Sequence, residues 1–351
     1  MKNPTVMIGM SGGVDSSVAA MLLKEASMDC AGATMQLWGE QDCTDAKTIA
    51  SQLEIPHFVL DLREVFKNTV VNRFVSAYEE GLTPNPCILC NKTMKFGLMM
   101  QKAQELGYDY VATGHYAKIQ KDPESGRFLL KKAADSHKDQ TYFLYRLSQD
   151  QLAHTLFPLG ELRKDQIREM AQAHGLVTAH KRDSQDICFI PDGDYVSFLR
   201  RYTGKNYPSG NFLDLHGKVL GSHQGAVNYT IGQRRGLGIA LGEPAYVCSK
   251  DMKKNTVTLG PNEVLMAPAL LAGEMNWILP PAGEPVRCSG KIRHSQYEQP
   301  ATLYPQEDGT CIAVFDTPQR AISPGQAAVF YQGDTVIGGG TILKALGKDE
   351  I

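Results

Sequence analysis

The 351-residue chain lacks several features that mark broad classes of protein. No apolar run approaches the roughly 20 residues that a membrane-spanning helix needs. The first residues, MKNPTVMIGMSGG, contain no long apolar segment followed by a small-residue cleavage site, so they are not typical of a secretory signal peptide. We therefore expect a cytoplasmic protein with no membrane partner.

The chain also has little excess charge of either sign. It contains 36 Lys and Arg against 38 Asp and Glu, a formal net charge of −2. This balance does not by itself indicate a nucleic-acid partner, whose binding would depend on local patches. Residues 113–146 hold seven basic against four acidic side chains, and a solvated hairpin face is the simpler interpretation of that excess.

Cysteines are present but show little pattern. Eight are spread along the chain, and in a large cytosolic protein reduced thiols that fill the core are the usual expectation. Only Cys87 and Cys90 form a C-x-x-C pair. Because there is no second such pair, a zinc ribbon is not favoured.

In the first part of the chain, segments with the apolar pattern of a strand alternate with segments in which apolar residues recur at helical spacing. Strands are expected at residues 5–10, 31–37, 57–60 and 110–113, and helices at residues 14–26, 44–53, 64–78 and 93–106. Strands that alternate with helices predict an α/β domain with a doubly wound, mostly parallel sheet. Ligands of such domains bind at the carboxyl ends of the strands.

The amino-acid composition changes near residue 200. Residues 204–242 are rich in Gly, Tyr, Asn and Arg, and from about residue 265 short strands are broken by Pro and Gly. Such short strands are typical of a small β-barrel. We expect a catalytic nucleotide-binding domain at 1–200, a small central domain at 201–264 and a C-terminal β-barrel at 265–351.

The stretch IGMSGGVDSS, residues 8–17, follows the first expected strand. Its glycines allow a close approach to phosphate, and the helix that follows directs its free N–H groups at the anion. Common phosphate loops place a lysine where Asp15 stands. Asp15 would repel phosphate unless a cation such as Mg²⁺ lies between them. An N-cap role explains one acidic or hydroxyl residue, but not the whole stretch.

This stretch resembles the PP-loop of the ATP pyrophosphatase superfamily, whose members cleave ATP between the α- and β-phosphates. The resemblance implies that the loop grips pyrophosphate and needs no lysine at that position. It places the ATP contacts at Gly9, Met10, Ser11, Gly12, Gly13, Val14, Asp15, Ser16, Met35 and Gly114.

Further blocks narrow the resemblance. TPNPCILCNKTMKF, ATGHYA, KDQTYFLY, SQDICFIPDGDY, YTIGQRRGLGI and SPGQAAVFY occur in this order along the chain. Together they resemble the tRNA-specific 2-thiouridylase (MnmA/TrmU) family. The resemblance implies ATP-dependent replacement of the 2-oxygen of the wobble uridine by sulfur. It implies tRNA as substrate and a sulfur donor such as a cysteine desulfurase or sulfur-relay protein.

Two cysteines match the catalytic cysteines of that family. Cys188 resembles the residue that carries a persulfide, and Cys90 resembles the partner that resolves it through a disulfide. A thiolate is the nucleophile in such chemistry. For either residue alone, an inert buried thiol would be the simpler interpretation.

Cys87 departs from the family, many of whose members have an aspartate there. A thiol and a carboxylate differ by several pKa units, so that aspartate's role does not transfer directly. An alternative is that Cys87, Cys90 and Cys188 bind an iron–sulfur cluster, for instance [4Fe–4S] with one open iron, because thiolates are the usual ligands. A plain redox pair is a third possibility.

The resemblance also implies contacts with tRNA. Asn85, Pro86 and Cys87 align with the segment that meets the flipped target base, which must leave the anticodon stack to react. Contacts with the rest of the tRNA are implied for His115, Lys138, Asp139, Gln140, Arg293, His294 and Gln326. Two other functions remain open: a PP-loop ligase acting on a small molecule, and an RNA-binding or sulfur-carrier protein without turnover.

Overall fold

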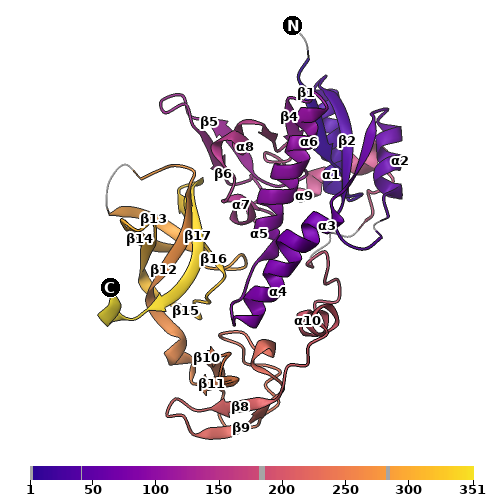
Figure 1. Cartoon of the computed structure of the whole chain (residues 1–351). Helices are drawn as coiled ribbons and strands as arrows, with labels where there is room; N and C mark the ends of the chain where they lie inside the picture. Colours follow the sequence, from indigo (N-terminus) through magenta and orange to yellow (C-terminus); the bar gives the residue numbers. More distant parts are fainter. Residues whose placement is uncertain (1–2, 41, 182–185, 282–284) are drawn as a thin grey trace.

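The computed structural model describes residues 3–40, 42–181, 186–281 and 285–351 (Figure 1). The first sheet has five parallel strands in the order β3-β2-β1-β4-β7. Their bounds are β1 Thr5–Gly9, β2 Asp29–Gln36, β3 His57–Asp61, β4 Tyr110–Ala112 and β7 Thr155–Leu156. The predicted parallel sheet is confirmed.

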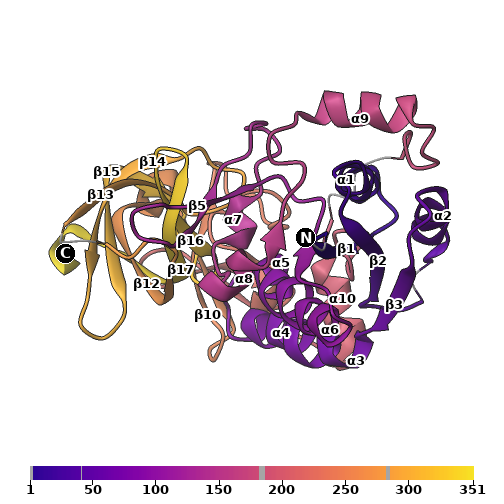
Figure 2. The same ribbon diagram turned by 90° about the horizontal axis from the view of Figure 1, so that it is seen from above.

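Helices cover both faces of this sheet (Figure 2). Alternate residues of β1 point to opposite faces, so Val6 and Ile8 join one core with α1 while Met7 joins another with α6. The helices are α1 Val14–Glu25, α2 Thr44–Gln52, α3 Arg63–Phe66, α4 Asn72–Glu79, α5 Pro86–Cys90, α6 Met99–Glu105, α7 Thr141–Leu144, α8 Gln149–Ala153, α9 Lys164–Ala173 and α10 Tyr195–Thr203.

Two predicted helices contain π-helical segments. The segment η1 (Lys67–Val71) joins α3 to α4, and η2 (Asn91–Leu98) joins α5 to α6. The second helix begins at Pro86, earlier than the expected residue 93. The spacing of apolar residues did not indicate this first helical turn. Proline at the first helical position and Asn85 as the cap are, however, ordinary signals for the start of a helix.

A small sheet follows, with the strand order β10-β11-β8-β9. Its strands are β8 Gly210–Leu213, β9 Val219–His223, β10 Tyr246–Asp251 and β11 Thr256–Gly260. Phe212, Val247 and Val257 are fully buried at its centre. This unit therefore has a core of its own.

The C-terminal part is a closed six-stranded antiparallel barrel, as predicted. The strands run β12-β15-β14-β13-β16-β17, and β17 pairs back onto β12. Their bounds are β12 Met266–Trp277, β13 Val286–Lys291, β14 Gln299–Pro305, β15 Cys311–Arg320, β16 Ala327–Gln332 and β17 Thr335–Leu346. Closure leaves few free strand edges.

A hairpin from the first part of the chain extends the barrel sheet. Its strands are β5 (Lys118–Lys121) and β6 (Phe128–Lys131), and Leu130 of β6 pairs with Val336 of β17. Leu130 and Val336 are both fully buried in one shared core. The first sheet and the barrel are therefore not independent folding units.

The hairpin also explains the local excess of positive charge. Lys131 pairs with Asp334 at 3.2 Å and Lys132 with Glu298 at 2.6 Å, both carboxylates of the barrel. The predicted hairpin is confirmed, but these lysines face the barrel and not solvent alone.

No helix in the described ranges is long and apolar enough to cross a bilayer.

Candidate functional site

The loop between β1 and α1 lies at the carboxyl end of the central strand. Gly12 has φ +71°, a left-handed conformation that favours glycine. Gly13 is the N-cap of α1 and has no side chain to cap it. The first N–H groups of this 12-residue helix therefore point, with the positive end of its dipole, in front of the loop. This arrangement fits a phosphate group.

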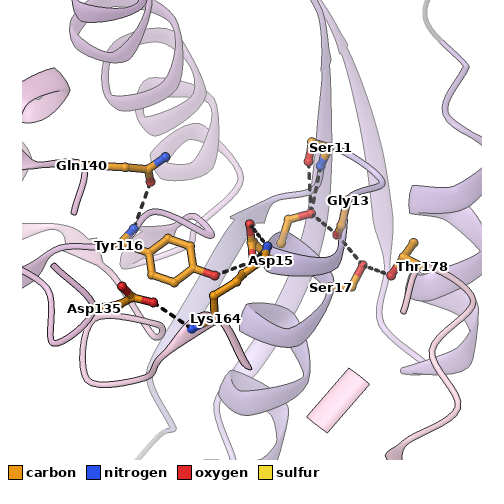
Figure 3. Close-up of polar contacts among 10 residues, drawn as sticks. Ser11, Gly13, Asp15, Ser17, Tyr116, Asp135, Gln140, Lys164 and Thr178 are labelled. Atoms are coloured by element: carbon orange, nitrogen blue, oxygen red, sulfur yellow. Dashed lines mark hydrogen bonds and ion pairs between the residues drawn. The ribbon is translucent and has the colours of Figure 1, made fainter. Parts of the chain in front are cut away.

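The three serines of the loop have different surroundings (Figure 3). Ser16 Oγ donates to the Gly13 carbonyl at 3.1 Å and accepts the Ser11 N–H at 3.2 Å. Ser17 is fully buried, donates to the same carbonyl and accepts from Thr178 Oγ1 at 3.1 Å. Ser11 is exposed and can therefore face a ligand, whereas the buried Ser16 braces the loop and Ser17 fixes the helix to a later segment.

Asp15 is held by two side chains from distant segments (Figure 3). Lys164 Nζ lies 2.7 and 2.9 Å from its two carboxylate oxygens, and Tyr116 Oη donates to Oδ1 at 2.6 Å. The Lys164 side chain is only 12% exposed. A cation that the loop itself lacks is thus supplied by the first residue of α9.

Asp15 also fits the predicted magnesium ion. Mg²⁺ is usually held by one or two carboxylates together with substrate phosphates, so the Asp15 carboxylate at the start of α1 is a suitable donor. The Lys164 ammonium contacts both oxygens of Asp15. The ion pair must therefore open, or be shared, before Asp15 can bind a metal ion.

The other residues expected at ATP are glycines in close backbone packing or residues with largely buried side chains. A Cβ on Gly114 would lie 2.8 Å from the Asp15 carbonyl carbon and the Ser16 nitrogen, so only glycine fits. The side chains of Met10 and Val14 are buried in the core. Met35 is half-buried in β2. Gly9 ends β1.

The cysteine motif lies on α5, which begins at Pro86. Asn85 caps the helix by accepting the Cys87 N–H at 3.2 Å. Cys87 and Cys188 are exposed and Cys90 is buried, and all three are free thiols. Phe189, next to Cys188, packs in the same core as Cys90. The structure therefore brings together the cysteines that the sequence separates.

The protein environment keeps these thiols protonated. Burial raises the pKa of Cys90 to about 12 and also raises the pKa values of Cys87 and Cys188. Lys95 opposes the rise at all three thiols, and the charges of neighbouring cysteines add to it at Cys90 and Cys188. A reactive thiolate must therefore form when a substrate or donor arrives.

The same three cysteines are the alternative cluster ligands. In the described ranges, no group of three or more His, Cys, Asp or Glu side chains is placed to hold a metal ion. The cluster alternative thus finds no preformed ligand set in this part of the chain. Ser184 and Gln185, in the block that precedes Cys188, lie outside the described residues.

Lys95 and His115 join the two halves of the site. Lys95 Nζ lies 3.4 Å from His115 Nε2, and His115 Nδ1 lies 2.7 Å from Thr113 Oγ1. Burial, and then the charge of Lys95, hold the pKa of His115 well below its usual value. His115 is therefore neutral and lies inside the protein.

The other residues expected at tRNA differ in exposure. Asp139 accepts the Ala133 N–H and the Thr141 hydroxyl, and burial raises its pKa. Gln140 bonds to Tyr116. Lys138 is half-buried, and His294 is exposed with its ring 4.4 Å from that of Phe143.

Two expected tRNA residues of the barrel are tied to backbone carbonyls. Gln326 Nε2 donates to Thr83 at 2.7 Å, and an Arg293 guanidinium nitrogen donates to Arg320 at 2.5 Å. Gln326 thereby links the barrel to the segment that leads into α5. Lys138 and His294 are the better placed for direct contact with a large ligand.

Several polar residues near the site were not predicted from the sequence, among them Lys95, Lys164 and Thr178. Lys95 belongs to the segment TPNPCILCNKTMKF, but nothing in the residue spacing showed that it faces His115. Lys164 and Thr178 lie far along the chain from the loop, so only the fold brings them to Asp15 and Ser17.

Family models match three consecutive parts of the chain. Residues 4–192 match a tRNA methyl transferase HUP domain and residues 196–261 a tRNA methyl transferase PRC-barrel domain. Residues 268–342 match an aminomethyltransferase beta-barrel domain. These matches agree with the three sheets of the fold.

Curated relatives match along their whole length. The tRNA-specific 2-thiouridylase MnmA of Clostridioides difficile (strain 630) is 48% identical, covering 98% of this chain and 99% of the relative. The enzyme of that name from Acetivibrio thermocellus is also 48% identical, covering 97% and 100%. A solved 4-thiouridine synthetase–RNA complex with bound ATP is 16% identical with a TM-score of 0.38, covering 56% and 50%. A TM-score this low does not identify a shared overall fold.

Proposed function

The chain belongs to the tRNA-specific 2-thiouridylase family, and on that premise we propose that it uses ATP to replace the 2-oxygen of the wobble uridine in tRNA with sulfur. One observation carries the proposal. The helix with Cys87 and Cys90 is connected to the glycine loop at residues 9–17 through Lys95, His115 and the residues that follow β4. This connection supports a site in which activation and sulfur delivery take place next to each other.

The first step is adenylation. The uridine 2-oxygen attacks the α-phosphorus of ATP, and the bond to the β-phosphate breaks. The N–H groups at the start of α1 and the Ser11 hydroxyl hold the leaving pyrophosphate. When bound, Mg²⁺ would supply charge neutralisation to the phosphates, and Asp15 is the residue that would hold it.

The second step delivers sulfur. The terminal sulfur of a Cys188 persulfide attacks C2 of the activated uridine, and AMP leaves with the former 2-oxygen. The Cys90 thiolate then attacks Sγ of Cys188, which forms a Cys90–Cys188 disulfide and releases the 2-thiouridine. A thiol reductant restores both cysteines, and a cysteine desulfurase or sulfur-relay protein reloads Cys188. This step needs two thiols.

The free thiols and their raised pKa values are compatible with this route. A thiol that stays protonated until its substrate arrives is protected from adventitious oxidation, which follows thiolate character. Asn85, Pro86 and Cys87 lead directly to Cys90, so a flipped base that meets this segment would lie next to the resolving thiol.

The test is product formation in tRNA. Purified protein is incubated with unmodified tRNA, ATP, Mg²⁺ and a persulfide donor, and 2-thiouridine is measured by mass spectrometry of the digested tRNA. In parallel, anaerobic protein reconstituted with iron and sulfide is tested for the cluster route, together with its iron content and absorption spectrum. Absence of 2-thiouridine under both conditions would refute the proposal.

A further inference from the structure

Two side chains, those of Lys164 and Tyr116, hold the Asp15 carboxylate. Lys164 contacts both of its oxygens and Tyr116 donates to one of them. Tyr116 is 2% exposed and the Lys164 side chain 12%. Both donors are thus embedded in the protein, so their positions follow those of the segments that carry them.

Those two segments share a further partner, the turn at residues 135–140 (Figure 3). The Lys164 backbone N–H donates to Asp135 Oδ2 at 3.0 Å. The Tyr116 N–H donates to Gln140 Oε1 at 3.0 Å, and the Gln140 N–H returns a bond to the Tyr116 carbonyl at 2.9 Å. The turn therefore supports both groups that hold Asp15.

The turn includes the basic residue Lys138, whose N–H bonds to the Asp135 carbonyl at 3.1 Å. Residues 138–140 are also those whose contact with tRNA the family resemblance implies. A phosphate drawn to Lys138 would act on Asp135, and through it on the start of α9. The turn is thus connected to Asp15 by two routes, one through Asp135 and Lys164 and one through Gln140 and Tyr116.

We propose that Lys164 and Tyr116 are positioning residues that make the state of Asp15 depend on tRNA docking at residues 135–140. This inference rests on the proposed function. Without tRNA, Lys164 occupies the Asp15 carboxylate and limits its access to a metal ion. With tRNA docked, the turn moves Lys164, which frees Asp15 for Mg²⁺ and brings the ammonium towards the phosphates. ATP and tRNA then bind with positive coupling, because each favours the same arrangement.

The coupling can be measured without turnover. Calorimetry gives the affinity for a non-hydrolysable ATP analogue with Mg²⁺, in the presence and absence of an anticodon stem-loop RNA. The ratio of the two affinities is the coupling factor, and it is expected to be about 10 or more in the wild type, within the usual range for linked sites. A wild-type factor of one would overturn the inference.

Three variants test the route. Lys164→Gln and Tyr116→Phe remove the two donors to Asp15, and Asp135→Ala removes the bond from the turn to the Lys164 N–H without altering the loop. Each should bring the coupling factor close to one. Lys164→Gln should also raise the analogue affinity measured without RNA, because Asp15 is no longer occupied. A purely structural role would lower affinity in both conditions and leave the ratio unchanged.

Lys118→Gln is the matched control, because it removes a lysine whose partner is the exposed Glu161 and not Asp15. It should keep the wild-type coupling factor. Folding of every variant is checked by its thermal midpoint, and Asp135→Ala keeps the test decisive if a loop variant fails to fold. Folded variants with the wild-type factor would overturn the inference. Failure of the wild type to make 2-thiouridine would instead refute the proposed function.

Discussion

The loop at residues 9–17 and the helix α5 differ in how their reactive groups are held. In the loop, Asp15 and Ser16 already have defined hydrogen-bond partners, and the N–H groups of α1 point at the phosphate position. On α5 and next to it, the cysteines are free, and burial keeps them protonated. One region is arranged in advance, and the other must be activated.

This difference indicates a division of labour within one site. Electrostatic stabilisation works best when donors are fixed before the reaction, because no reorganisation is needed. A nucleophilic thiol carries the opposite risk, since a permanent thiolate would be oxidised. Substitutions in the two regions should therefore have different effects.

The largest effect is expected for the two cysteines that we propose as catalytic. Cys188→Ala and Cys90→Ala should each lower 2-thiouridine formation by at least about 1,000-fold, because loss of one member of a nucleophilic unit removes its function. ATP binding should survive in both variants. Mass spectrometry of tRNA and calorimetry with ATP check the two parts. An active Cys188→Ala enzyme with either sulfur source would contradict the persulfide assignment.

The second effect concerns the loop alone. Asp15→Ala should lower tRNA-dependent pyrophosphate release by about 100-fold, the size expected when one fixed electrostatic group is lost at a reacting centre. The rate at which iodoacetamide alkylates the cysteines should not change. Pyrophosphate release at the wild-type rate would show that Asp15 has no part in the reaction.

The third prediction is the pH dependence of the thiols. Their pKa values are raised, so each thiol is protonated at neutral pH and its thiolate fraction grows about tenfold per pH unit below the pKa. Alkylation should therefore accelerate from pH 7 to pH 9. The exposed Cys188 should react before the buried Cys90, as peptide mapping would show. Rapid alkylation of Cys90 at pH 7 would remove the contrast between the two regions.

The fourth effect is steric. Gly114→Ala places a methyl group 2.8 Å from the backbone of Asp15 and Ser16, so the loop must shift. The affinity for ATP should fall by about 10-fold, as measured by calorimetry. Gly347→Ala is the matched control, because its added methyl group would lie 3.7 Å from Glu350 Oε2, near the far end of the chain. Equal affinities in the two variants would contradict the fit.

The smallest effect is expected at Cys87. If two thiols suffice, Cys87→Ala should keep 2-thiouridine formation within about threefold of the wild type, as for most changes outside a reacting unit. Loss of iron together with activity would instead favour the cluster route. Yields with a persulfide donor and with reconstituted iron and sulfide decide between the two.

Local signals predicted most of the fold. The buried β-branched strands and the helical periods of the first domain, and the Pro- and Gly-broken strands of the barrel, each specify their element without distant partners. The start of α5 was missed because an apolar period says little about a turn that begins with Asn85 and Pro86. The pairing of β6 with β17 was also missed, since strand partners are set by tertiary packing.

The site was predictable where one short segment forms it. The glycine loop is such a segment, and its place after β1 follows from its sequence. The environment of Asp15 was not, because Lys164 and Tyr116 come from other elements. Likewise, the motif that contains Asp139 and Gln140 did not show that both side chains are half-buried and bonded to other residues of the chain.

The pairing of β6 with β17 has a consequence for how the chain is made. During synthesis, Leu130 leaves the ribosome long before its strand partner Val336. The Tyr142 hydroxyl likewise emerges long before the Ala327 carbonyl to which it donates a hydrogen bond. Contacts between such distant residues form slowly because a long loop must close. The nascent first domain therefore exposes an apolar surface until the last strand emerges. Chaperones that bind such surfaces would act on this chain late in its translation.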